Sequence, residues 1–119
     1  MFVDWSSDII LVKGVFDAII AGRNAVPILG STLNKDSVLL HKIVKEDSGV
    51  YVALDPDATK KELEIIRTLL DFDIEVWKID IGDNEDVGSM RKDQFRKCLE
   101  NATLITSDNY LLLTLAMSI

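Results

Sequence analysis

The stretch IILVKGVFDAI, residues 9–19, joins an apolar run, a Lys-Gly turn and the start of an amphipathic helix. Four consecutive aliphatic residues are typical of a strand that is buried on both faces, and the hydrophobic period changes after Gly14. A strand that leads directly into a helix is the unit from which parallel sheets are built. The stretch therefore predicts the first strand–helix unit of an α/β domain.

The same alternation continues along the chain. Apolar runs that predict strands lie at residues 9–12, 25–29, 50–54 and 74–81. Amphipathic segments that predict helices lie at residues 15–21, 34–46 and 58–72 and, after a polar loop, near 92–99 and at about 108–117. This order predicts a mainly parallel sheet of about four strands with helices on both faces, right-handed crossovers and the third strand at the centre.

Length and composition indicate one domain, residues 1–119, in which 48 % of the residues are hydrophobic and 28 % are charged. No apolar run is long enough for a membrane span, and the acidic N-terminus does not resemble a secretory signal, so we expect a cytoplasmic protein with no membrane contact. A net charge of −7 disfavours broad phosphate binding through a basic surface. The single residues Cys98 and His41 cannot build a zinc site by themselves. We expect Cys98 to be a buried, inert thiol and His41 to be solvated or to cap a helix.

Two acids, Asp55 and Asp57, directly follow the third apolar run. Pro56 favours an extended backbone at this point, which would direct both carboxylates to the same side. Carboxylate oxygens at this spacing suit Mg²⁺. The alternative is that Asp57 caps the next helix and Asp55 only ends the strand.

Other polar residues follow the remaining strands. A third acid, Asp86, comes after the fourth strand and is expected at the same edge of the sheet. Lys60 and Lys61 lie in the first turn of a helix, where cations oppose the helix dipole, so they face either phosphate or solvent. The turn after the second strand offers a third group, whose members are suited to close backbone approach or to anion binding: Gly30, Ser31 and Thr32.

Taken in order, four segments resemble the Toprim domain of primases, topoisomerases and small nucleases. They are KGVFD (13–17), LGST (29–32), LDPD (54–57) and EDVG (85–88). The resemblance covers about residues 8–90, which form the expected core, and leaves about 91–119 as a C-terminal helical extension. Within the family, the chain is most similar to the Toprim core of phage and bacterial DNA primases, which act in DNA replication.

The resemblance implies Mg²⁺- or Mn²⁺-dependent nucleotidyl transfer on nucleic acid, with Asp55, Asp57 and Asp86 as metal ligands. Lys13 occupies the position of the family's catalytic Glu, and that role does not carry over because lysine offers no metal-ligating oxygen. Gly14 is expected to permit a sharp turn. Asp17 is expected either to face the acidic cluster or to brace that turn through hydrogen bonds.

Several functions stay open at this point. The chain is a primase-like enzyme module, a catalytically degenerate Toprim binding module in which Lys13 replaces a metal ion, or a small Toprim nuclease. For the first function we expect nucleotides as ligands and a protein partner that supplies the zinc-binding and helical modules of a primase. A flavodoxin-like domain, in which the acids at the strand ends are only helix caps, is the remaining alternative.

Overall fold

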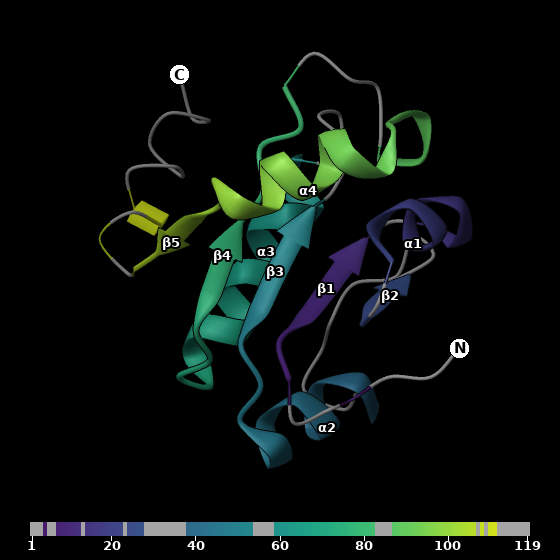
Figure 1. Cartoon of the computed structure of the whole chain (residues 1–119). Helices are drawn as coiled ribbons and strands as arrows, with labels where there is room; N and C mark the ends of the chain where they lie inside the picture. The colour runs from purple at the N-terminus through teal and green to yellow at the C-terminus, as the bar shows by residue number, and fades with distance from the viewer. Residues whose placement is uncertain are drawn as a thin grey trace.

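The computed structural model of the chain describes residues 4, 7–12, 14–22, 24–27, 38–53, 59–82, 87–106, 108 and 110–111, without the side chains of residues 15, 38 and 59–62. Strands and helices alternate along these residues (Figure 1). In chain order they are β1 (Ile9–Val12), α1 (Val15–Ala21), β2 (Ala25–Pro27), α2 (Val38–Glu46), β3 (Val50–Ala53), α3 (Thr59–Asp71), β4 (Val76–Lys78), the 3-10 helix η2 (Val87–Ser89), α4 (Lys92–Glu100) and β5 (Thr103–Ile105).

The strands form one sheet in the order β2-β1-β3-β4-β5. β1 pairs in parallel with β2 and with β3, and β3 pairs in parallel with β4. The prediction of a mainly parallel α/β sheet is confirmed, and β3 lies at its centre as expected. This architecture is compatible with a Rossmann-like α/β fold.

The last strand, β5, differs from the prediction of about four strands. It pairs antiparallel with β4, with Trp77 opposite Leu104. Three residues are too few to show a hydrophobic period, and only Ile105 of β5 is buried. The sequence pattern therefore gave no strand between the helices expected near 92–99 and at 108–117.

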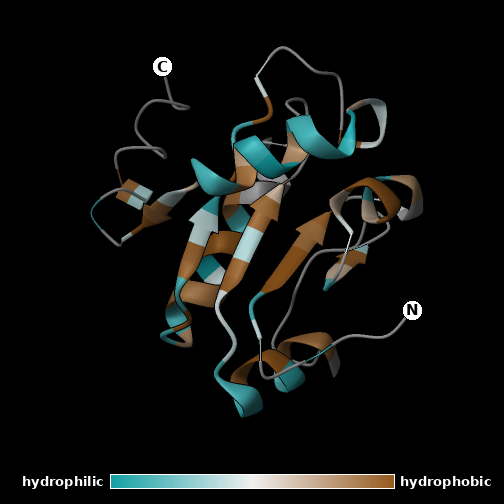
Figure 2. Ribbon diagram, in the orientation of Figure 1, coloured by the Kyte–Doolittle hydropathy of each residue, from teal (hydrophilic) through white to brown (hydrophobic). Residues whose placement is uncertain are grey.

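Helices cover both faces of the sheet, as predicted (Figure 1). On one face α2 and α3 pack on the strands through the buried residues Ile9, Leu11, Leu40, Ile43, Val50, Val52, Ile65, Ile66, Leu69, Ile74, Val76 and Ile105. On the other face α1, η2 and α4 enclose Ile10, Val12, Ala18, Ala25, Ala53, Ile79, Ile81, Val87, Met90 and Phe95. Figure 2 shows the apolar strands between these layers and the hydrophilic outer side of α4.

The bounds of the elements follow the sequence pattern closely in the helices and less closely in the strands. Helix α1 spans the predicted residues, and α3 differs from its prediction by one residue at each end. Of the predicted strand 74–81 only Val76–Lys78 pairs in the sheet, although the apolar residues Ile74, Ile79 and Ile81 are buried all the same. Burial of the flanking residues thus made the strand look longer than it is. Among the described residues, none of the helices is both long and apolar enough to cross a membrane.

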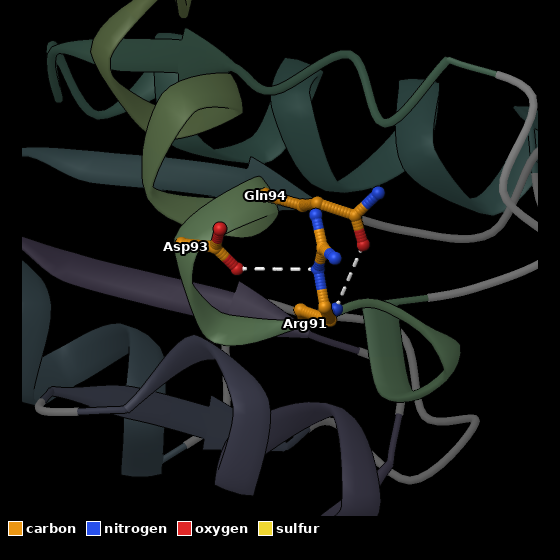
Figure 3. Close-up of polar contacts among 3 residues, drawn as sticks. All are labelled: Arg91, Asp93 and Gln94. Atoms are coloured by element: carbon orange, nitrogen blue, oxygen red, sulfur yellow. Dashed lines mark hydrogen bonds and ion pairs between the residues drawn. The ribbon is translucent and has the colours of Figure 1, made fainter.

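Helix α4 begins with side chains that satisfy its first turn (Figure 3). Gln94 Oε1 accepts a hydrogen bond of 2.9 Å from the backbone N–H of Arg91, and Arg91 Nε lies 3.4 Å from Asp93 Oδ1. Both charged side chains are exposed, so this ion pair adds little stability. Farther along α4, Cys98 is half-buried against the core rather than fully buried as expected. His41 is exposed on α2, in agreement with a solvated position.

Candidate functional site at the carboxyl edge of the sheet

The candidate site lies at the point in the sheet where the order of the strands reverses. After β1 the chain forms β2 on one side of β1 and then β3 on the other side. Open α/β sheets bind ligands beyond the carboxyl ends of the strands at such a reversal. Val12 and Ala53, the last residues of β1 and β3, are register partners, so both strands end at the same level. We call this end of the sheet the carboxyl edge.

Most residues that the sequence predicted for the site lie outside the described residues. This holds for the following group: Lys13, Gly30, Ser31, Thr32, Asp55, Asp57 and Asp86. Lys60 and Lys61 are in the first turn of α3, as expected, but their side chains are not among those described. Gly14 and Asp17 are described fully, and they show how the turn after β1 is built.

Among the described residues, Asp17 is a buried acid at the carboxyl edge, with only 7 % of its surface exposed. Its Oδ2 accepts a hydrogen bond of 3.0 Å from the backbone N–H of Gly14, the residue that precedes α1. Its Oδ1 accepts a second hydrogen bond of 2.6 Å from the backbone N–H of Gly88 in η2. The carboxylate therefore pairs with a backbone N–H at the start of α1 that has no partner within the helix. It also joins α1 to η2. Of the two roles expected for Asp17, this geometry is that of the brace.

Of the two glycines that bond to Asp17, only Gly88 occupies a position that requires glycine. Gly14 has φ −136° and ψ 176°, an extended conformation that any residue adopts. The expectation that Gly14 permits a sharp turn is therefore corrected, because its backbone angles do not require glycine. At Gly88 a Cβ atom would lie 2.9 Å from Asp17 Oδ1 and 3.4 Å from Phe16 Cβ. Gly88 is thus the residue whose missing side chain lets η2 approach α1.

A further acid, Asp80, follows β4 at the same edge. Its Oδ1 accepts a hydrogen bond of 2.8 Å from the backbone N–H of Gly82, which has φ 66°. The side chain is exposed and stabilises the turn that leaves β4. Sequence reasoning missed Asp80 because it was counted inside the predicted strand 74–81. The signal was the Asp-x-Gly spacing, which is typical of a turn.

No group of three or more His, Cys, Asp or Glu side chains is placed to hold a metal ion within the described ranges. The acids predicted as Mg²⁺ ligands are not part of those ranges. The magnesium site therefore stays a prediction.

Comparison with known proteins adds no identification, since no protein-family model and no curated protein matches the chain.

Proposed function

We propose that this chain is a Toprim-like domain that uses Mg²⁺ or Mn²⁺ for nucleotidyl transfer on nucleic acid, as the corresponding domain of a phage-type DNA primase does. Asp55 and Asp57 would hold the ion, and Asp86 would join them directly or through water. The observation that carries the proposal is the common level at which β1 and β3 end, with Val12 opposite Ala53. The predicted Asp-x-Asp begins two residues after Ala53.

A second observation supports the inclusion of Asp86. The hydrogen bond from Gly88 N–H to Asp17 Oδ1 fixes η2 against the first turn of α1. Asp86 precedes η2 by one residue, and Lys13 precedes Gly14. Two segments that carry predicted site residues are therefore anchored to each other by a contact between described residues.

The donor set fits a hard cation. Mg²⁺ is bound in proteins by one or two carboxylates together with water and substrate phosphate, and these segments supply carboxylates. When bound, such an ion polarises a phosphoryl oxygen and neutralises the charge that develops during transfer. The residues of the chain would orient the phosphates, with the Lys60 and Lys61 ammonium groups and the Ser31 and Thr32 hydroxyls as candidates. A partner protein with zinc-binding and helical modules would complete a primase.

Location of the metal can be tested with Mn²⁺, which broadens the NMR signals of nearby amides. We expect the amide signals of Gly14 and Gly88, at the carboxyl edge, to broaden at substoichiometric Mn²⁺. The amide of Gly49, which precedes β3 at the opposite edge, serves as the internal control. Broadening of Gly49 to the same degree, or of none of the three, would contradict the proposal.

Variants identify the metal ligands in a second experiment. Asp55→Asn and Asp57→Asn should each weaken Mg²⁺ or Mn²⁺ binding, measured by titration calorimetry, because each removes one carboxylate ligand. Asp71→Asn is the matched control, since Asp71 is an exposed acid at the end of α3, away from the carboxyl edge. Equal metal affinities for all three variants and the wild-type protein would contradict the assignment of Asp55 and Asp57 as ligands.

Lys13 favours a second candidate function, that of a binding module without catalysis. An ammonium group among the acids would stand in for a metal ion electrostatically. In that case Lys13→Glu should raise metal affinity and lower the melting temperature of the metal-free protein, because it adds like charge. Lys45→Glu, on the exposed side of α2, is the control for metal affinity. An unchanged metal affinity and melting temperature in Lys13→Glu would exclude this candidate.

Activity assays separate the remaining alternatives. Nucleotide incorporation on a single-stranded template with Mn²⁺ supports the primase-like module, with or without added primase modules. Cleavage of labelled single-stranded or duplex substrates with Mn²⁺ supports a nuclease instead. Binding of either substrate with no covalent change in any of these mixtures supports the binding module.

A further inference from the structure

The predicted metal ligands lie at different distances along the chain from the paired strands. Asp55 follows Ala53, a residue that is still paired in the sheet, by two positions. Asp86 follows Lys78, the last paired residue of β4, by eight positions. The strand pairing by itself therefore fixes the position of Asp86 far less closely than that of Asp55.

The 3-10 helix η2, which begins directly after Asp86, is held by both apolar and polar contacts. Val87 and Met90 are buried in the core that α1 and α4 enclose. The backbone N–H of Met90 donates a hydrogen bond of 3.0 Å to the Val87 carbonyl and so closes the turn. Between these two residues, the N–H of Gly88 donates its 2.6 Å hydrogen bond to Asp17 Oδ1. Asp17 thus supplies a polar contact from α1 near the point where η2 begins.

The backbone of η2 lies directly against the first turn of α1. A Cβ atom at Gly88 would lie 3.6 Å from the backbone nitrogen of Asp17, in addition to its closer contacts with the Asp17 and Phe16 side chains. Consecutive Cα atoms are about 3.8 Å apart, so the Cα atom of Asp86 lies within about 7.6 Å of that of Gly88, whatever the backbone conformation between them. A displacement of η2 from α1 would therefore displace Asp86 as well.

The geometry of Asp17 favours a role through η2 over direct contact with an ion. Both carboxylate oxygens already accept backbone hydrogen bonds, Oδ2 from Gly14 at 3.0 Å and Oδ1 from Gly88 at 2.6 Å, and the residue is buried. A metal ion and the water and phosphate that it binds need ligands that they can reach from the solvent side. A buried carboxylate with both oxygens engaged is better suited to hold two backbone segments in place.

We infer that Asp17 is a positioning residue for the metal site that the proposed function assigns to the carboxyl edge, and the inference rests on that function. The hydrogen bond from the Gly88 N–H would hold the segment that carries Asp86 in a fixed position relative to α1. The hydrogen bond from Gly14 would do the same for the residue that follows Lys13. Metal affinity should then depend on Asp17 although its carboxylate contacts no ion.

The first test measures the affinity for Mn²⁺ by titration calorimetry, at a temperature where circular dichroism shows every variant to be folded. Asp17→Ala should bind Mn²⁺ about tenfold more weakly than the wild-type protein, an effect typical of groups that orient metal ligands. Asp17→Asn, which keeps one acceptor oxygen, should lie between the two. Ile43→Ala is the control for stability, because it opens a cavity in the core on the other face of the sheet. It should bind Mn²⁺ as the wild-type protein does.

A second variant separates the effect of position from that of charge. Gly88→Ala leaves every charge in place, but its Cβ must displace the Asp17 carboxylate from η2. We expect Gly88→Ala to weaken Mn²⁺ binding by about fivefold or more, and to have no further effect in the Asp17→Ala background. Asp93→Asn removes an exposed acid five residues after Gly88 and is the control for net charge. It should change the affinity by less than about twofold.

The hydrogen bond itself can be followed without metal. The amide of Gly88 should exchange slowly with solvent in the wild-type protein and faster in Asp17→Ala, and equal rates would overturn the inference. Wild-type Mn²⁺ affinity in both Asp17→Ala and Gly88→Ala would overturn it too and leave the proposed function intact. Weakened binding in Asp17→Ala alone would assign the effect to charge, which is a third result against the inference. If the wild-type protein does not bind Mn²⁺, the proposed function fails and the inference fails with it.

Discussion

Asp17 Oδ1 lies 2.6 Å from the backbone nitrogen of Gly88, a residue 71 positions later in the chain. The same carboxylate accepts a hydrogen bond from Gly14, so one buried side chain serves two backbone donors from different elements. Removing a buried acceptor leaves both donors unsatisfied, and hydrogen bonds to charged groups are stronger than neutral ones. We therefore expect Asp17 to contribute strongly to the stability of the carboxyl edge.

Asp17→Ala should therefore lower the free energy of unfolding by about 2–3 kcal/mol, measured by urea denaturation. Asp17→Asn should cost less, because its amide keeps one acceptor oxygen. Asp93→Ala is the control: Asp93 occupies the first turn of α4 but is exposed, so its loss should cost about 0.5 kcal/mol or less. Equal effects at positions 17 and 93 would contradict the bracing role.

Gly88→Ala should also destabilise the protein, by about 2 kcal/mol, because the added Cβ must displace a carboxylate that is buried and bonded. Gly14→Ala should stay within about 1 kcal/mol of the wild type, since its Cβ would lie 3.8 Å from Asp17 Oδ2. In the Asp17→Ala background the cost of Gly88→Ala should largely vanish. A double-mutant cycle by urea denaturation measures this coupling, and strict additivity would refute it.

Much of this fold could be predicted from its hydrophobic pattern. The four parallel strands, the central β3 and the helices on both faces follow from alternating apolar runs and amphipathic segments. The strand β5 could not be predicted in this way, because it has only three residues and one buried side chain. The end of β4 was misplaced because Ile79 and Ile81 are buried, although the paired residues of β4 end at Lys78.

The candidate site was less accessible to sequence reasoning. The hydrogen bond between Asp17 and Gly88 uses a backbone N–H, which nearly every residue type has, so the residue type at position 88 does not reveal it. The two residues are also far apart in the sequence. The expectation that Gly14 permits a sharp turn was wrong, since the backbone there is extended. The Asp-x-Asp pattern and Lys13 lie outside the described residues, so their chemistry still depends on the resemblance and on the level at which β1 and β3 end.

Asn24 should be sensitive to substitution for two separable reasons. Asn24→Ala loses three hydrogen bonds and places a Cβ residue at φ 65°, whereas Asn24→Gly loses only the bonds. We expect Asn24→Ala to be about 3 kcal/mol less stable than the wild type and Asn24→Gly to recover about 1 kcal/mol of that loss. Asp73→Gly, at an exposed position with φ 58°, is the control and should be neutral or slightly stabilising. Thermal or urea unfolding reports all three.

Tyr51 should make stability depend on alkaline pH. Its pKa is raised above the ordinary value of 10.0, chiefly by burial and then by Asp8 and Glu75. The folded state therefore holds the phenolic proton more tightly than the unfolded state does. This contribution is fully present below about pH 10 and is lost as the pH rises through the raised pKa.

The measurement is urea denaturation as a function of pH for the wild type and Tyr51→Phe. Above about pH 10 the wild type should lose stability more steeply than Tyr51→Phe, which has no phenol to ionise. In Asp8→Asn, ultraviolet titration of the phenol should give a lower pKa than in the wild type, still above the ordinary value because burial remains. Parallel stability curves for the wild type and Tyr51→Phe would show that Tyr51 does not contribute.

The two strands at the ends of the sheet, β2 and β5, also affect how the protein behaves at high concentration. Exposed strand edges template the addition of strands from other molecules, and short edges that lack donors resist this. Each of these strands has only three residues, and β2 ends in Pro27, which has no N–H to offer an incoming chain. On the other side, β5 reverses the strand direction and so ends the parallel pairing. Among the described residues, the sheet therefore ends on both sides in a short strand, which disfavours edge-to-edge aggregation.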